Sequence, residues 1–124
     1  MDRVFYLCAG AAGFVGVALG AFAAHGLRTK LAPDLFVAFE TAVRYQMYHV
    51  FALCAAAWAW ARWQHKIFSV AGWLFVAGIL VFSGSLYLLA LTGNRWLGAI
   101  TPFGGMALLT GWLCLTVGAW RAKA

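Results

Sequence analysis

Four long apolar segments, separated by short polar stretches, dominate the chain. They cover approximately residues 4–24, 35–62, 68–91 and 104–120. Crossing a hydrocarbon core about 30 Å thick takes roughly 20 residues of helix, so each segment is long enough to span a membrane. We therefore predict an all-α, polytopic membrane protein whose single domain, residues 1–124, is an antiparallel bundle of four transmembrane helices.

Small residues recur at helical spacing in the first and last segments. Ala12, Gly16 and Gly20 repeat every four residues, and Gly104 and Gly111 lie seven residues apart. Helix association in lipid depends on close backbone approach, which small side chains allow. We expect both faces to pack against other helices, and we expect the first segment to lie at the centre of the bundle.

Polar side chains concentrate at the head of the second segment. Glu40, Arg44 and Tyr48 fall on one helical stripe, with Tyr45 and His49 beside it. The spacing of four residues with the acid first favours an ion pair between Glu40 and Arg44 on the same helix. Two interpretations remain open: the pair only neutralises itself where the helix leaves the membrane, or it belongs to a functional site.

Polar residues from three other segments are expected at the same end of the bundle. In an antiparallel chain His25, Ser83, Ser85 and Thr101 share the depth of Glu40 and Arg44, and lipid offers no water to satisfy them. We predict one hydrogen-bonded polar cluster near the non-cytoplasmic leaflet, either a binding site or a structural one. The candidate residues are His25, Glu40, Arg44, Tyr45, Tyr48, His49, Ser83, Ser85 and Thr101.

The composition excludes an ordinary soluble domain, since 65% of the residues are hydrophobic, 10% are charged and the mean hydropathy is +0.87. The net charge of +6 is dispersed between the apolar segments, so we expect no nucleic-acid binding. Lys and Arg are more numerous on the side of both termini, which predicts cytoplasmic termini. That side holds Arg3, Arg62, Lys66, Arg121 and Lys123, against Arg28, Lys30, Arg95 and, if it lies outside the core, Arg44.

The residue types that carry metal or redox chemistry are sparse. Cys8, Cys54 and Cys114 all fall in apolar segments without ligand spacing, so we interpret them as packing residues and expect no metal site. Only His25 and His49 could together ligate a haem, and no haem or other cofactor is expected. Sequence motifs of hydrolases and metalloproteases are absent, so no enzymatic role is expected. A signal peptide cleaved after Ala23 is a competing interpretation that the length of the apolar segment disfavours.

Four ordered motifs resemble a known family. They are GAFAAHGL (residues 20–27), FETAVRYQMYH (39–49), FSGSLYLLALTG (82–93) and ITPFGG (100–105). Together they are similar to the bacterial inner-membrane family called domain of unknown function 423, which has a mitochondrial relative, transmembrane protein 256. Ala23 departs from the glycine expected at that position. The resemblance implies a small four-helix protein of the inner membrane and brings no established reaction, substrate or cofactor.

Two functions remain open. The first is a structural or accessory membrane protein that assembles, as a homo-oligomer or in a larger complex, through its glycine-rich helix faces. The second is a small transporter, channel or lipid-binding protein that uses the polar cluster as its site. Transport is expected to need an oligomer, because one four-helix bundle has little room for a pore.

Overall fold

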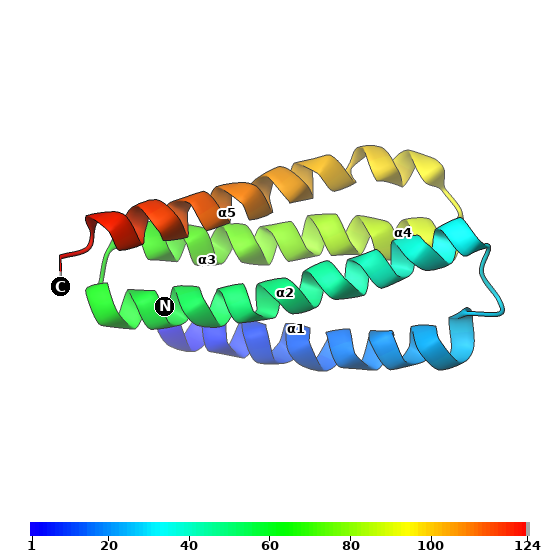
Figure 1. The fold of residues 1–124 in the computed structure, drawn as a ribbon, viewed down its shortest axis with the longest axis horizontal. Coiled ribbons are helices and arrows are strands. Elements are labelled where there is room, and N and C mark those ends of the chain that lie inside the picture. Colours follow the sequence, from blue (N-terminus) through cyan, green and yellow to red (C-terminus); the bar gives the residue numbers. More distant parts are fainter. Residues whose placement is uncertain (124) are drawn as a thin grey trace.

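The computed structural model describes residues 1–123 as four helical rods that lie side by side (Figure 1). The first rod is α1 (Asp2–Phe22) continued by a π-helical turn, η1 (Ala23–Leu27). The second is α2 (Pro33–Trp63), with Pro33 at its first position, where the missing N–H costs nothing. The prediction of an all-helical chain is confirmed over residues 1–123. The first three rods begin and end within a few residues of the predicted ranges, whereas the fourth begins at Arg95, well before the predicted start at residue 104.

The third and fourth rods are each composed of more than one helical segment. The third runs through α3 (Lys66–Gly78), a π-helical turn, η2 (Ile79–Ser83), and α4 (Gly84–Thr92). The fourth is a short 3-10 helix, η3 (Arg95–Ala99), followed by α5 (Thr101–Arg121). Gly93 (φ 72°) ends α4 and Gln64 (φ 57°) ends α2, so both short connections turn through a left-handed residue.

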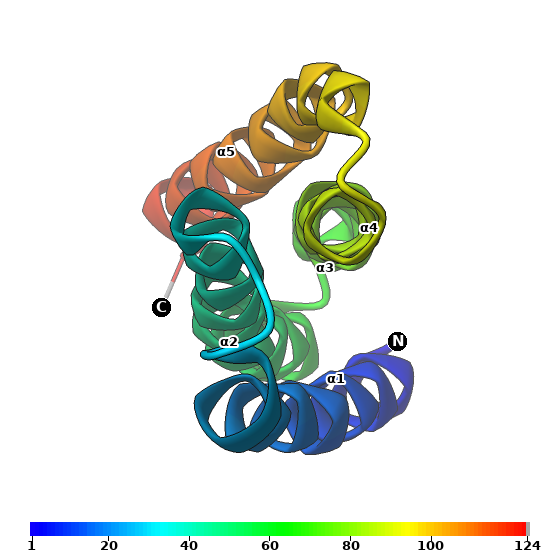
Figure 2. The ribbon, with the colours of Figure 1, turned by 90° about the vertical axis from the view of Figure 1, so that its right-hand side faces the viewer.

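Three of the four rods are long and apolar enough to cross a membrane: Asp2–Leu27, Lys66–Thr92 and Arg95–Arg121. Rod α2 is not among them, because Glu40, Arg44, Gln46 and His49 lower its hydropathy. Its low hydropathy coincides with a central position. Viewed end-on, α2 lies between α1 and the α3–α4 rod, and α5 packs on α3 and η2 (Figure 2).

The expectation of a central first helix is therefore wrong. Helix α1 packs almost entirely on α2 and reaches α3 only near its start, where the Phe5 ring meets Gly72 and Trp73. Helix α2 instead packs against α1, α3, η2 and α4, and it buries a stripe of residues spaced three and four apart. The stripe comprises Phe39, Ala42, Gln46, His49, Leu53 and Ala56.

Small residues allow the close approaches between these rods. A Cβ on Gly16 would stand 2.5 Å from Met47 Sδ, and one on Gly20 would stand 3.3 Å from Val43 Cγ1, both on α2. On α5, Gly104 lies against the Phe82 backbone and Gly111 against the Phe75 ring. Ala12 also faces α2, because its carbonyl accepts a hydrogen bond from Gln46. These five positions all face neighbours within the same chain.

Candidate functional site

The charged members of the predicted cluster make no ion pair with one another within residues 1–123. His25 and Arg44 are exposed, and Glu40 is partly buried. Arg44 Nη2 donates to the Thr41 hydroxyl at 3.3 Å. The predicted pair between Glu40 and Arg44 is wrong, since the ion pairs within residues 1–123 are those of Asp2 with the amino terminus and of Asp34 with Arg95.

The Asp34–Arg95 pair joins the start of α2 to the start of the fourth rod at the exposed end of the molecule. The Arg95 guanidinium donates to the Asp34 carboxylate and holds the pKa of that carboxyl below its usual value. Both side chains are more than half exposed, so the pair fixes the position of the loops and adds little stability.

The hydroxyl members of the cluster form two separate contacts around the π-helical turn η2. Ser83, which is 1% exposed, donates to the Ala42 carbonyl on α2 at 2.7 Å. Ser85 donates to the Phe82 carbonyl, and its hydroxyl lies 2.6 Å from that of Thr101 on α5. The sequence indicated one continuous helix here. The π-turn was not predicted, and such turns are frequent at functional sites.

His49 is held as a neutral imidazole between α2 and α5. Trp112 Nε1 donates to His49 Nε2 at 3.0 Å, and an indole N–H can only donate. His49 Nδ1 therefore carries the proton and donates to the Tyr45 carbonyl at 2.6 Å. Both ring nitrogens are engaged, so His49 could ligate a metal only by giving up a hydrogen bond in a 5% exposed position.

A second buried polar contact, absent from the predicted site, joins three rods. Gln46 Nε2 donates to the Ala12 carbonyl on α1 at 2.7 Å, and Gln46 Oε1 accepts from the Tyr87 hydroxyl on α4 at 2.6 Å. Gln46 is 4% exposed. The sequence signal that could have revealed this contact is the position of Gln46 on the buried stripe of α2. A polar residue on an inward-facing stripe must find a hydrogen-bond partner inside the protein.

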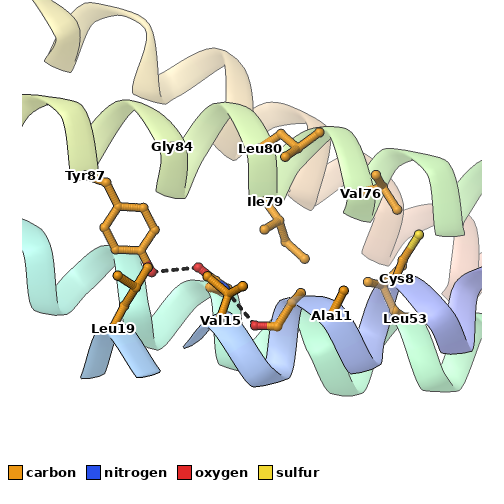
Figure 3. A pocket seen from close by; sticks show the side chains of 12 residues that line it. Cys8, Ala11, Val15, Leu19, Leu53, Val76, Ile79, Leu80, Gly84 and Tyr87 are labelled. Carbon is orange, nitrogen blue, oxygen red and sulfur yellow. Dashed lines mark hydrogen bonds between the residues drawn. The ribbon is translucent and has the colours of Figure 1, made fainter. Parts of the chain in front are cut away.

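An elongated groove lies over this contact, between α1 and the α3–α4 rod (Figure 3). We call it the α1–α4 groove. It encloses about 410 Å³, and its walls are apolar except for Gln46 and Tyr87. Its lining consists of Cys8, Ala11, Ala12, Val15, Leu19, Gln46, Leu53, Val76, Ile79, Leu80, Gly84 and Tyr87.

A second groove, between α2 and α5, contains three members of the predicted site. Tyr45 and Tyr48 line it with their rings partly exposed, and His49 and Trp112 lie beside them. It encloses about 520 Å³. The structure thus distributes the predicted residues among this groove, the contacts around η2 and the exposed end of the molecule. It does not unite them in one hydrogen-bonded cluster within residues 1–123.

The described residues contain no group of three His, Cys, Asp or Glu side chains that could hold a metal ion. The three cysteines are free and partly buried, and they are distributed over α1, α2 and α5. The two grooves can therefore bind apolar molecules and offer them a few hydrogen bonds.

Comparison with known proteins places the chain among membrane proteins. A UPF0382 membrane protein of Staphylococcus saprophyticus is 42% identical over 119 residues, covering 96% of this chain and 98% of the relative. The UPF0382 membrane protein YwdK of Bacillus subtilis is 43% identical, with coverages of 94% and 96%. The UPF0382 inner membrane protein YgdD of Escherichia coli is 37% identical, with coverages of 98% and 93%. No solved structure matches the chain.

A family model described as "Protein of unknown function (DUF423)" matches residues 19–105, which is more than half of the chain. The predicted resemblance is confirmed: the matched residues include all four motifs completely, from GAFAAHGL to ITPFGG. The names of the relatives assign them to membranes and state no activity. This chain is a small membrane protein that belongs to the DUF423 family, whose members are named UPF0382 membrane proteins.

Proposed function

We propose that all four rods cross the bacterial inner membrane as an antiparallel bundle, with α2 as the central span. Helix α2 runs alongside α1 and the α3–α4 rod, so a membrane that contains those two rods also contains α2. Its low hydropathy is compatible with this position, because Gln46 and His49 face neighbouring helices and hydrogen-bond there. The exposed surface of the other rods is largely aliphatic and aromatic.

Both termini are expected in the cytoplasm. The start of α1 and the end of α5 lie at one end of the molecule (Figure 1), together with most of the Lys and Arg residues. A green fluorescent protein fused after Ala124 should fluoresce, and alkaline phosphatase at the same position should be inactive. Alkaline phosphatase fused after Lys30, beyond the first rod, should be active. The reverse pattern would place the termini in the periplasm.

We propose that the protein binds a lipid-like molecule in the α1–α4 groove and that it binds without catalysis. The observation that carries this proposal is the buried amide of Gln46 at the base of an apolar groove. Of its two N–H groups, one donates to Ala12, and the other has no hydrogen-bond partner within residues 1–123. An unpaired donor in an apolar setting favours a ligand that brings an acceptor.

The dimensions of the groove favour a lipid chain. A volume of about 410 Å³ is within the usual range of small-molecule sites. Gln46 is thirteen residues into α2, about 20 Å from its start at 1.5 Å per residue, so the amide lies at the depth of acyl chains. We infer an apolar chain along Val15, Leu53 and Ile79, with a carbonyl or similar oxygen accepting from Gln46 Nε2.

The same packing argues against the two other functions considered. Gly16, Gly104 and Gly111 contact helices of the same chain, so these faces are not free for assembly with other proteins. The spaces between the rods are filled by Phe5, Phe39, Phe68 and Phe75, all fully buried, which disfavours a channel along the bundle. With these two functions disfavoured, we infer that the protein acts by binding a ligand in the lateral α1–α4 groove.

The test is to fill the groove. A Cβ on Gly84 has no heavy atom within 4 Å, and Gly84 lines the groove, so Gly84→Leu should block it without a clash. Gly10 is equally open and does not line the groove, which makes Gly10→Leu the matched control. Lipids that co-purify in mild detergent are to be identified and counted by native mass spectrometry. We expect Gly84→Leu alone to lose a bound lipid, and the same bound lipids in all three proteins would refute the proposal.

A further inference from the structure

A small polar pocket lies at the opposite end of the molecule from Asp34 and Arg95, where α1 begins and α5 ends. It is formed by the first turn of α3 and the last turn of α5 and encloses about 200 Å³. Its lining consists of His65, Lys66, Ile67, Gly118 and Arg121. It shares no residue with the α1–α4 groove, and the function proposed above does not depend on it.

Gly118 brings the two walls of this pocket together. A Cβ at this position would stand 2.7 Å from both Ile67 Cγ2 and Phe68 Cε1, so α5 lies directly against the first turn of α3. Arg121 follows Gly118 by three residues, which is nearly one helical turn, and therefore lies on the same face. The close approach at Gly118 thus lets Arg121 on α5 and Lys66 on α3 line the same pocket.

The charges of the pocket are not balanced by acidic residues. The chain contains three acids, of which Asp34 and Glu40 lie in the first turns of α2, at the opposite end. The third, Asp2, lies 3.8 Å from the amino terminus. Within residues 1–123, neither Lys66 nor Arg121 takes part in an ion pair. Two cationic side chains around one cavity give a site that complements an anion.

The start of α3 adds to this preference. His65 is its N-cap and makes no side-chain capping hydrogen bond, so the first N–H groups of the helix are not capped by a side chain. The positive end of the helix dipole lies there as well. An anion in the pocket would meet both the side-chain cations and these backbone donors.

The surroundings of the pocket indicate which anion it receives. The rods that form it, Lys66–Thr92 and Arg95–Arg121, are apolar enough to cross a membrane, and the pocket lies at their ends. Just inward of it, Val70 and Leu113 expose apolar side chains, and Trp120 is 87% exposed. A headgroup in the pocket would leave its acyl chains against these surfaces, as in basic pockets between membrane helices.

We propose that this pocket binds the phosphate group of an anionic phospholipid. Lys66 and Arg121 supply the charge, and the uncapped first turn of α3 supplies backbone donors. The lipid is held at the end of the bundle where α1 begins and α5 ends, on the surface formed by α3 and α5.

The test compares lipid binding by the full-length protein and by two charge-matched double variants. Native mass spectrometry in mild detergent is to measure binding of phosphatidylglycerol and phosphatidylcholine. We expect the wild type to prefer phosphatidylglycerol. The Lys66→Gln/Arg121→Gln variant should bind it about thirtyfold more weakly, at roughly 1 kcal/mol for each of the two basic residues. Arg28→Gln/Lys30→Gln removes the same charge from the first loop and should bind as the wild type does.

Each other outcome overturns the proposal. Equal weakening in both double variants would indicate general charge attraction, and equal binding of the two lipids would indicate no headgroup site. Inorganic phosphate is tested as a competitor; if it binds through Lys66 and Arg121 while the lipid does not, the pocket serves a free anion. Lys66→Arg should retain binding, and far-UV circular dichroism should show that all variants keep their helices, so that a loss of binding reports on the pocket.

Discussion

Replacing Gly104 by alanine is expected to destabilise the protein by about 3 kcal/mol, the upper part of the usual range for overpacking. A Cβ at this position would overlap the backbone N of Phe82 and stand 2.7 Å from its Cα. Backbone atoms in the π-helical turn η2 cannot rotate away as a side chain can, so α5 and η2 would have to separate. The free energy of unfolding in mixed detergent micelles, followed by circular dichroism, measures the effect.

Gly105 provides a control in the same turn of α5. A Cβ there would meet only ring atoms of Phe82, at 3.7 and 3.8 Å, which is ordinary van der Waals contact. Gly105→Ala should therefore be neutral or stabilise the helix by up to about 1 kcal/mol through helix propensity. Equal effects of the two substitutions would mean that α5 and η2 do not approach as closely as the structure has them.

Replacing Gln46 by leucine is expected to destabilise the protein by about 2 kcal/mol. The change removes the hydrogen bonds to Ala12 and Tyr87 and leaves the Tyr87 hydroxyl without its partner. Tyr87→Phe should cost less, about 1 kcal/mol, because it breaks one hydrogen bond and leaves Gln46 bonded to Ala12. The same unfolding measurement applies to both variants.

The double variant separates this contact from general effects of the substitutions. Gln46→Leu with Tyr87→Phe should cost less than the sum of the two changes, with a coupling of about 0.5–1.5 kcal/mol, as found for hydrogen bonds between membrane helices. Thr116→Val is the control, since the exposed Thr116 hydroxyl bonds only to the Trp112 carbonyl of its own helix. Strict additivity would argue against the Gln46–Tyr87 hydrogen bond.

The apolar segments determined the helices because helix formation is local. Four segments of sufficient length, begun or ended by residues such as Pro33 and Gly93, define rods whatever their neighbours. The repeats of small residues likewise marked surfaces of close approach, at Gly16 and Gly104 among others. Family membership also followed from the sequence, since four ordered motifs carried it.

The π-helical turns and the contacts around them did not follow from local pattern. Residues 79–83 are as apolar as the helices on either side, and nothing in their periodicity marks an added residue in the turn. The turn is defined by what surrounds it: Ser83 bonds to the Ala42 carbonyl on one side, and Gly104 lies against Phe82 on the other. Both partners are distant in the sequence, so only the packed bundle brings them together.

The orientation of α2 was decided by tertiary structure alone, and with it the site. The polar pattern of the sequence indicated the stripe of Glu40, Arg44 and Tyr48 as the site, but this stripe faces away from the neighbouring helices. Gln46 and His49 face those helices and hydrogen-bond to them. Periodicity reveals that a helix has distinct faces but not which face meets which neighbour. In a membrane protein the inward face can be the polar one, because helix neighbours satisfy hydrogen bonds that lipid cannot. Which polar residues face inward, and with what partners, therefore depends on how the four rods pack.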